Sequence, residues 1–281
     1  MVEPASRLSD RVIVITGAAS GFGLLVAQRA AERGARVVGG DLNSDVLAEA
    51  FGALAARGLN VAWRVVDVTS AQDMKALASL AVERFDRIDV LVNNAGIMPL
   101  AFFADHERAA AGWSKAIDVN LKGVVNGISA VFDQMIAQGQ GHVVNISSTY
   151  SNAPTEGAGV YAATKAAVNM VSESLRIEGQ GRIKVSIVRP TGVPTTGLGA
   201  GVINRRASIG MVGHHAEVAL AKMKQLFSNS LPAEFADPEQ IGYFALDPAV
   251  VAETILYVID QPWGVSISDI TVRAAGEPYL L

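Results

Sequence analysis

The chain has 281 residues, of which 50% are hydrophobic and 18% are charged, and its formal net charge is −4. It contains no cysteine, which excludes disulfides, thiolate metal sites and cysteine nucleophiles. No basic cluster points to a nucleic-acid partner, and no apolar run approaches the roughly 18 residues of a membrane-spanning helix. The opening residues 1–7 lack the apolar stretch of a secretory signal. We therefore expect a cytoplasmic protein with a single domain over residues 1–281.

Short apolar runs alternate with longer amphipathic stretches along most of the chain. This order predicts parallel βαβ units with right-handed crossovers, and hence an α/β fold with one doubly wound parallel sheet of about seven strands and helices on both faces. The runs carry few charges, as expected for strands covered on both sides. The expected strands are 11–16, 35–41, 61–67, 88–93, 142–147, 183–189 and 265–273, and the expected helices are 21–33, 44–57, 160–177, 215–227 and 249–260.

The alternation stops in residues 190–248, which contain five prolines and a glycine-rich stretch near 197–213. A segment this long is unusual as a plain connection. We interpret it as a substrate-binding loop or lid. A solvated excursion or an oligomer contact is the alternative.

A glycine-rich turn, Thr16 to Gly23, lies between the first expected strand and the first expected helix. Glycines there allow a tight turn and a close approach to a pyrophosphate, which sits at the N-terminus of the helix. Three glycines alone are a weak signal, but the strand before them and the helix after them give the context that a dinucleotide site needs. The expected cofactor contacts in this turn are Gly17, Ser20, Gly21, Phe22 and Gly23.

Asp41 ends the second expected strand, eighteen residues after Gly23. A carboxylate there can accept hydrogen bonds from both ribose hydroxyls of an adenosine and would repel a 2′-phosphate. No Arg or Lys follows among the next three residues, which begin with Leu42, a second expected contact. The pattern favours NAD over NADP. The alternative is that Asp41 only caps the next helix.

Five further motifs follow in register: Asp67-Val68, Asn93-Asn94-Ala95-Gly96, Asn120, Ser148, and Tyr161 with Lys165. With these, residues 12–195 resemble the short-chain dehydrogenase/reductase family. The resemblance implies a Rossmann-type fold and an NAD(P)-dependent oxidoreductase. It also implies that the cofactor contacts include Asp67, Val68, Asn93, Ala95, Gly96, Tyr161, Lys165, Pro190, Val193 and Thr195. The fit weakens at Thr191, where the family usually has glycine.

Tyr161 and Lys165 are four residues apart, so on a helix they share one face. A nearby ammonium and a positive nicotinamide ring favour the phenolate, so we expect a lowered pKa for Tyr161 and a role as general base or acid. Ser148 is expected to donate a hydrogen bond to the substrate oxygen. Its spacing of thirteen residues from Tyr161 is the reason to prefer it to Ser147. The resemblance implies that Asn120 holds a water in a proton relay.

Two further expectations concern the remaining side chains near these motifs. Position in the chain suggests that the apolar wall of the substrate pocket includes Met98, Trp113, Tyr150, Met211, Met223 and Phe227. Adjacent histidines such as His214 and His215, with no carboxylates in ligand register, are usually not a metal site, so we assign no metal.

The expected helix 160–177 is apolar around most of its circumference, which indicates burial on both sides. The resemblance implies that this helix pairs with another subunit, so we expect a homodimer or homotetramer. The first functional hypothesis is an NAD-dependent alcohol dehydrogenase, or a ketone reductase in reverse, acting on an apolar or bulky small molecule. The alternatives are a non-redox relative, such as an epimerase or dehalogenase, and a sensor or scaffold that binds the cofactor without turnover.

Overall fold

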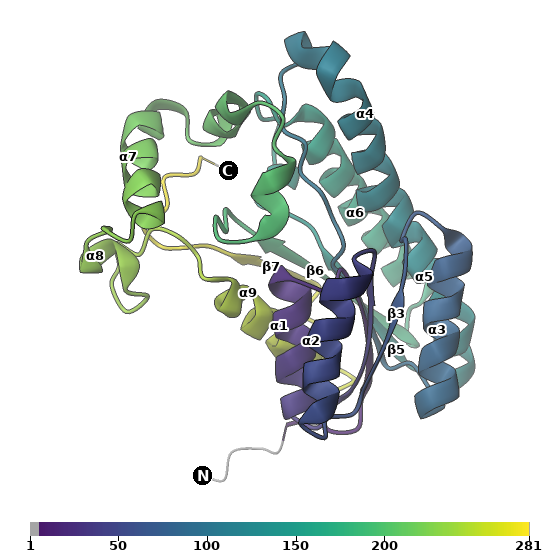
Figure 1. Cartoon of the computed structure of the whole chain (residues 1–281). Coiled ribbons are helices and arrows are strands. Elements are labelled where there is room, and N and C mark those ends of the chain that lie inside the picture. The colour runs from purple at the N-terminus through teal and green to yellow at the C-terminus, as the bar shows by residue number, and fades with distance from the viewer. Residues whose placement is uncertain (1–5, 281) are drawn as a thin grey trace.

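The structure is a computed structural model that describes residues 6–280. The expectation about a secretory signal rests largely on residues 1–5, which lie outside the described residues. Seven parallel strands form one sheet in the order β3-β2-β1-β4-β5-β6-β7 (Figure 1), so the predicted α/β fold is confirmed. The strands are β1 (Val12–Thr16), β2 (Arg36–Asp41), β3 (Val61–Val65), β4 (Val90–Asn93), β5 (Gly141–Ile146), β6 (Ile183–Pro190) and β7 (Asp269–Val272).

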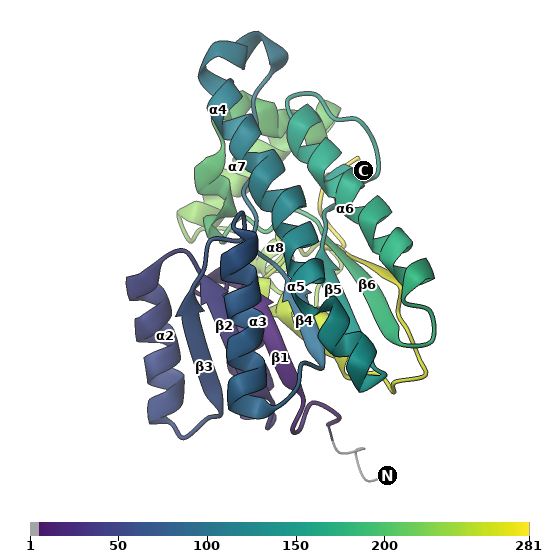
Figure 2. The same ribbon diagram turned by 90° about the vertical axis from the view of Figure 1, so that its right-hand side faces the viewer.

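Helices cover both faces of the sheet, and Figure 2 shows the second of these layers from outside. On one face α1 packs against α9, beside α2; on the other α3 packs against α5, and α6 against α4 and β6. The first layer consists of α1 (Gly21–Glu32), α2 (Ser44–Ala56) and α9 (Pro248–Ile259). The second consists of α3 (Ala71–Phe85), α4 (His106–Ile117), α5 (Gly123–Gln138) and α6 (Gly159–Glu178).

The central strands consist mainly of apolar residues because both of their faces are covered. Every residue of β1, β4 and β5 is buried. In β1, Ile13 and Ile15 point to the α1 side and Val14 to the α3 side, which is the alternation of a strand. Burial of each such side chain contributes about 1.5–3 kcal/mol, so these strands form the stable frame of the fold.

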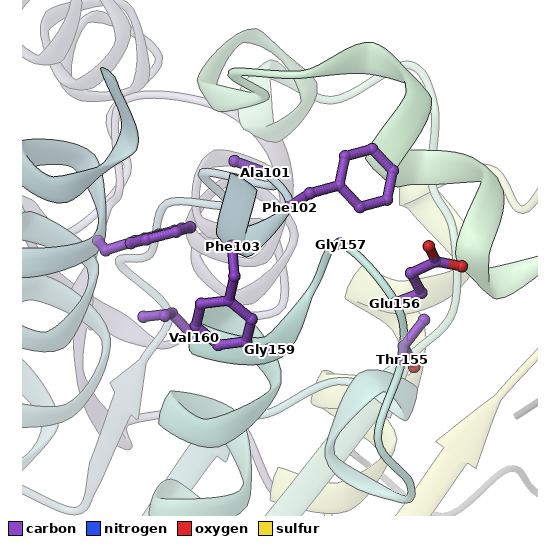
Figure 3. A pocket seen from close by; sticks show the side chains of 9 residues that line it. Ala101, Phe102, Phe103, Thr155, Glu156, Gly157, Gly159 and Val160 are labelled. Carbon is purple, nitrogen blue, oxygen red and sulfur yellow. The ribbon is translucent and has the colours of Figure 1, made fainter. Parts of the chain in front are cut away.

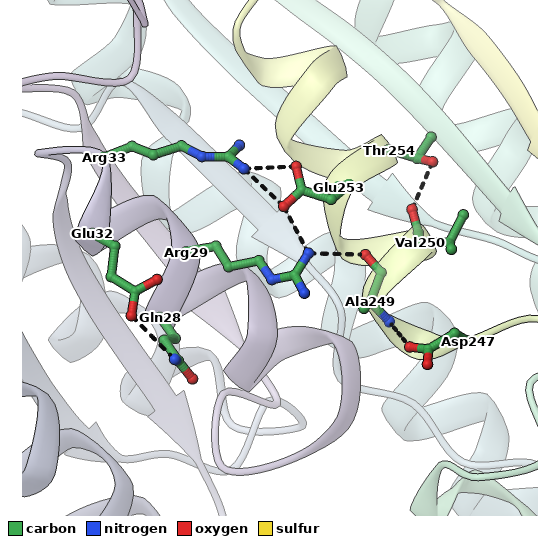
Figure 4. Close-up of polar contacts among 9 residues, drawn as sticks. All are labelled: Gln28, Arg29, Glu32, Arg33, Asp247, Ala249, Val250, Glu253 and Thr254. Carbon is green, nitrogen blue, oxygen red and sulfur yellow. Dashed lines mark hydrogen bonds and ion pairs between the residues drawn. The ribbon is translucent and has the colours of Figure 1, made fainter. Parts of the chain in front are cut away.

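Helix α9 is held on α1 mainly by apolar contacts, with an ion-pair group at the surface (Figure 4). Glu253 accepts from Arg29 at 2.6 Å and from Arg33 at 2.7 Å. Exposed pairs of this kind contribute about 0–1 kcal/mol. The N-terminus of α9 is fixed by Asp247, whose carboxylate accepts the N–H of Ala249 at 2.6 Å.

The predicted strand over residues 265–273 is too long at its start. Val265 donates its N–H to the carbonyl of Pro262 in a turn, and pairing with β6 begins at Asp269. Within residues 6–280, no helix has both the length and the apolar character that crossing a bilayer requires.

The strand order reverses between β1 and β4, so the carboxyl ends of these two strands border a crevice. In open α/β sheets, ligands bind at this edge. The segment after β6 lies near it, because the N–H groups of Ile203 and Asn204 both bind the carbonyl of Leu100. Its role as a lid stays a prediction. The segment contains the short turns η4 (Gly197–Gly201), η5 (Arg205–Met211) and η6 (Gly213–His215), and the helices α7 (Ala216–Phe227) and α8 (Ala233–Ala236).

Candidate active site

The glycine-rich turn joins β1 to α1 at the carboxyl edge of the sheet. Gly17 and Gly21 adopt left-handed backbone angles, with φ of 65° and 53°, which other residues rarely adopt. A β-carbon on Gly23 would lie 2.2 Å from the carbonyl oxygen of Gly17, so α1 reaches the turn only because residue 23 has no side chain. Ser20 is the N-cap of α1, its hydroxyl makes no capping bond, and Phe22 packs against the core. The free N–H groups of the first helical turn suit an anionic phosphate.

Asn94 shapes this turn, and the sequence reasoning missed its role. Its side-chain amide donates to the carbonyls of Thr16 at 2.9 Å and Gly17 at 3.1 Å. The Thr16 hydroxyl in turn accepts the N–H groups of Asn94 and Ala95. Asn94 therefore ties β4 to β1 at the switch point. The signal was available, because a polar residue directly after β4 must lie beside the end of β1.

Asp41 lies at the end of β2 and faces the glycine-rich turn. Its Oδ2 accepts the N–H of Ala19 at 3.0 Å, and its Oδ1 accepts the N–H of Asn43 at 3.0 Å. Each carboxylate oxygen can accept a second hydrogen bond. The N-cap of α2 is Asn43, which accepts the N–H of Val46, so the alternative that Asp41 caps this helix is wrong. Leu42 is exposed beside it.

Asp67 and Val68 follow β3 on the same edge of the sheet. The Asp67 carboxylate accepts the N–H of Thr69 at 2.9 Å, and its own N–H binds Asp73, the acid in the first turn of α3. Val68 is buried against Gly123. Asp67 is half-buried and available to a ligand at its outer side, whereas Val68 offers mainly its backbone.

The structure brings Tyr161, Lys165 and Ser148 together. Tyr161 and Lys165 lie one turn apart on α6, with the lysine Nζ 6.0 Å from the centroid of the tyrosine ring. Lys165 Nζ donates to the carbonyl of Ile146, at the end of β5, at 2.8 Å. Tyr150 packs edge-on against the Tyr161 ring, with centroids 5.5 Å apart. These contacts hold both side chains rigidly beneath the carboxyl edge.

The neighbouring serines are distinguished by their contacts. The Ser148 hydroxyl lies beside that of Tyr161, close enough for hydrogen bonding from the serine to lower the pKa of the tyrosine. Ser147 instead donates its hydroxyl to the carbonyl of Lys165 at 3.2 Å and is buried. Ser148 is therefore the serine whose hydroxyl faces the tyrosine, as the spacing of thirteen residues predicts.

Asn120 lies inside the protein in a turn of π-helix between α4 and α5. Its Oδ1 accepts the N–H of Ile97 at 2.8 Å, and its Nδ2 donates to the Ile97 carbonyl and to the Thr164 hydroxyl. Both hydrogens of the Asn120 amide are engaged, so within the side chain only the second lone pair of Oδ1 is left to bind a relay water. The relay stays a prediction, and the clear role of the side chain is to position the 96–97 backbone beside Lys165.

The pKa of Tyr161 differs from the expectation. Burial raises the pKa of Tyr161 to about 12, and the hydrogen bond from Ser148 lowers it only in part. Burial also lowers the pKa of Lys165 to about 8. In the polypeptide alone the pKa of Tyr161 is therefore raised, because removal of the phenolate from water outweighs the hydrogen bond from Ser148. The lowering expected beside a positive nicotinamide ring stays a prediction.

Apart from Asn94, the three residues of the motif at positions 93–96 have different environments. The Asn93 side chain is buried and donates to Asn145 at 2.8 Å, so it points into the core, and only its backbone can face a cofactor. The N–H of Ala95 is bound to Thr16. A β-carbon on Gly96 would lie 3.5 Å from Lys165 Nζ, which places its backbone beside the catalytic candidates.

The residues after β6 form the remaining side of the crevice. Pro190 is buried at the end of β6, opposite Val272. Val193 packs on the core and Thr195 is exposed. Thr191, where the sequence departs from the usual glycine, is buried and donates its hydroxyl to Glu277. Whether Pro190, Val193 and Thr195 contact a cofactor stays a prediction.

Three of the six side chains expected in the substrate-pocket wall lie near Tyr161, and whether they contact a substrate stays a prediction. Met98, Tyr150 and Met211 belong to one apolar cluster with Tyr161. Phe227 is 66% exposed on α7 and Trp113 packs on Phe103, so neither belongs to this cluster. Figure 3 shows the separate hollow that Trp113 and Phe103 line, with no catalytic candidate in its lining. Met223 lies on α7 and is not part of the cluster either.

His214 and His215 lie in η6, with ring centroids 3.9 Å apart. Within residues 6–280, no group of three His, Asp or Glu side chains is arranged to hold a metal ion.

The family described as short chain dehydrogenase matches residues 11–205. Glycine betaine reductase ATRR of Emericella nidulans is 33% identical over 98% of this chain, which spans only 19% of that protein. The uncharacterized oxidoreductase Lmo0432 of Listeria monocytogenes is 30% identical over 97% of this chain and 99% of its own length. A short chain dehydrogenase/reductase from Burkholderia phymatum, solved in complex with NAD, is 27% identical, with a TM-score of 0.73 over 94% of this chain and 89% of its own.

Proposed function

The chain belongs to the short-chain dehydrogenase family of NAD(P)-dependent oxidoreductases, and on that premise we propose that it is an NAD-dependent dehydrogenase for a secondary alcohol, or a ketone reductase in reverse. The observation that carries this proposal is the placement of Ser148 beside Tyr161, with Lys165 one helical turn away and fixed by the Ile146 carbonyl.

A bound nicotinamide supplies the hydride acceptor, or the donor in the reverse direction. Tyr161 takes the hydroxyl proton of the alcohol as the carbonyl forms, and returns a proton to the oxygen in reduction. Ser148 donates a hydrogen bond to the same oxygen while charge develops on it. Lys165 is fixed by the Ile146 carbonyl, so its charge is held beside the tyrosine and the predicted position of the nicotinamide ribose.

The glycine-rich turn and Asp41 fit a dinucleotide. The turn has glycine at positions 17, 21 and 23, two of them with the left-handed angles that a tight turn needs, and Asp41 presents its carboxylate beside the turn. A carboxylate here accepts hydrogen bonds from the ribose of NAD and repels the 2′-phosphate of NADP, which supports NAD. The proposed contacts are those named from the sequence, with the backbone of Asn93 and Val68 in place of their side chains.

The environment of Tyr161 supports a neutral substrate with apolar bulk. The side chains packed around it are Leu100, Tyr150 and Met211, together with Met98 and Val202. An apolar pocket with a few phenol hydroxyls binds an uncharged ketone better than a zwitterion, because a buried unpaired charge is costly.

A homo-oligomer in the cytoplasm is proposed as the working form. Its support is the outward face of α6, where Met170 is 70% and Ile177 is 65% exposed in the single chain. Apolar side chains in a row on a helix surface are typical of a contact with another subunit.

The test is the formation of NADH from NAD⁺ across a panel of secondary alcohols, with NADH binding measured in parallel by fluorescence. Turnover that is faster with NAD⁺ than with NADP⁺ is the expected result. Saturable NADH binding with no turnover on any alcohol would contradict the proposal and favour a cofactor sensor. Turnover without net reduction of NAD⁺ would favour a non-redox relative.

A further inference from the structure

The segment that follows β7 runs back to the candidate active site. Figure 1 shows this yellow stretch passing α8 and α7 and reaching the green turns after β6. Gly276 donates its N–H to the carbonyl of Tyr243 at 2.8 Å, and Leu280 donates to the carbonyl of Met211 at 3.0 Å. Residues 274–280, which we call the return segment, are therefore anchored at two points on the 190–248 segment.

A third anchor joins the return segment to the end of β6. The Thr191 hydroxyl donates to the Glu277 carboxylate, which also pairs with Arg273 at 3.1 Å. Thr191 further binds the carbonyl of Val272 through its N–H, at 3.1 Å. The unusual threonine at position 191 thus has a specific partner, which a glycine there could not bind.

Tyr279 occupies the space between these anchors. A β-carbon on Gly192 would lie 2.0 Å from the Tyr279 hydroxyl oxygen, so the ring lies directly on the backbone that precedes Val193. The same ring packs in the apolar cluster that contains Tyr150 and Tyr161. Burial and the negative charge of Glu277 raise the pKa of Tyr279 to about 12, which keeps its hydroxyl protonated.

We infer that the return segment forms one wall of the substrate pocket, with Tyr279 as a specificity-determining residue. This inference rests on the proposed dehydrogenase function. Tyr279 limits the space beside Tyr161 on the side of the predicted nicotinamide contacts. The Thr191–Glu277 bond fixes the ring in that place. The substrate class is a neutral secondary alcohol or ketone whose bulk is bounded by a phenol ring.

The first test compares two alcohols that differ in size, 1-phenylethanol and 1-(2-naphthyl)ethanol, each with NAD⁺. Tyr279→Ala should raise the ratio of kcat/KM for the larger alcohol over the smaller by about tenfold or more, because hydrophobic pockets discriminate bulk by roughly 10- to 200-fold. Tyr257→Ala, which changes an exposed tyrosine on α9, is the matched control and should leave the ratio unchanged. An equal change for both alcohols in Tyr279→Ala, or no change, would overturn the inference.

The second test does not depend on activity. Gly192 is not among the residues with positive φ, so alanine suits its backbone, and the three atoms nearest to an added β-carbon all belong to the Tyr279 side chain. Gly192→Ala should lower Tm in the chain with Tyr279, and this loss should disappear in the Gly192→Ala/Tyr279→Ala double variant. Equal losses in both backgrounds would show that the ring is elsewhere and overturn the inference.

The two tests separate this inference from the proposed function. Turnover with an unchanged size preference would retain the dehydrogenase and reject the pocket wall. No turnover by the unaltered protein, with the Gly192–Tyr279 coupling present, would reject the dehydrogenase and the pocket while retaining the contact.

Discussion

At the scale of single residues, burial sets the proton state of the catalytic candidates. Tyr161 is only 3% exposed and Lys165 only 5%. Burial opposes ionisation of both, and the pKa values of about 12 for the tyrosine and about 8 for the lysine are the result. A bound positive nicotinamide ring would favour the phenolate. We therefore expect Tyr161 to become an effective base only when the cofactor is bound.

Replacing Lys165 should stabilise the fold. Burial lowers the pKa of Lys165 from 10.5 to about 8, so at pH 7 the buried ammonium lowers the free energy of unfolding by roughly 3 kcal/mol. Its hydrogen bond to the Ile146 carbonyl offsets about 1 kcal/mol of this. Lys165→Met should raise the free energy of unfolding at pH 7 by about 1–2 kcal/mol while removing activity. Urea unfolding measures this, with the exposed Lys75→Met as control.

The stability that Lys165→Met gains over the unaltered protein should depend on pH. Between pH 8 and 10.5 the unfolded chain holds the Lys165 proton and the folded chain does not, so the stability of the unaltered protein rises with pH, by about 1.4 kcal/mol per unit. The advantage of Lys165→Met should therefore shrink over this range. An advantage of equal size at pH 7 and pH 10 would show that the ammonium is not buried.

Asp41 should determine the choice of cofactor. Asp41→Ala removes hydrogen bonds to the adenosine ribose, each worth about 1.5–3 kcal/mol for a charged acceptor, and also removes the repulsion of a 2′-phosphate. The ratio of the NADPH and NADH dissociation constants should fall by about ten- to a hundredfold. Asp45→Ala, an exposed acid on α2, is the control. An unchanged ratio in Asp41→Ala would contradict this role.

At the scale of elements, the junction of β1 and β4 depends on Asn94. Asn94→Ala leaves the Thr16 and Gly17 carbonyls without their donor, so we expect a loss of about 1–2 kcal/mol in unfolding free energy and weaker NADH binding. Asn60→Ala, at an exposed position before β3, is the control. Unchanged NADH affinity in Asn94→Ala would contradict this role, because the glycine-rich turn would then keep its shape without the hydrogen bonds from Asn94.

Most of these elements could be predicted from the sequence, for a physical reason. Strands such as β1 and β4 are short runs of mainly apolar residues, and α1 begins directly after the glycine-rich turn. The short turns η4 to η6 have no periodicity, and their positions are set by contacts such as Leu100 with Ile203. The sequence therefore predicts the frame and leaves the segment after β6 undetermined.

The candidate site shows the same division. Tyr161, Lys165 and Ser148 are predicted from the resemblance to the family, and helix periodicity and the end of β5 explain why they lie close together. The bond between Thr191 and Glu277 joins residues that are 86 positions apart. No local pattern predicts such a pair, nor the inward direction of the Asn93 side chain, which is decided by its contact with Asn145 on the next strand.

At the scale of the whole molecule, the outward face of α6 is proposed to join subunits. Met170→Glu places a charge where an interface would bury it, which costs several kcal/mol, so the assembly should dissociate. Sedimentation velocity at micromolar concentration should show a smaller species for this variant. Ile241→Glu, at an 87% exposed position, should sediment like the unaltered protein. A monomer in the unaltered protein would contradict the proposed oligomer.

The most direct test of the account is the effect of Tyr161→Phe on turnover. NADH formation from a secondary alcohol would be measured with the unaltered protein, with Tyr161→Phe and with Tyr257→Phe, the last on the surface of α9. The account predicts that Tyr161→Phe lowers kcat by at least about 100-fold, because it removes the general base. The NADH dissociation constant should stay within a few-fold, and Tyr257→Phe should keep full activity. Equal kcat in Tyr161→Phe and the unaltered protein would contradict the proposed mechanism.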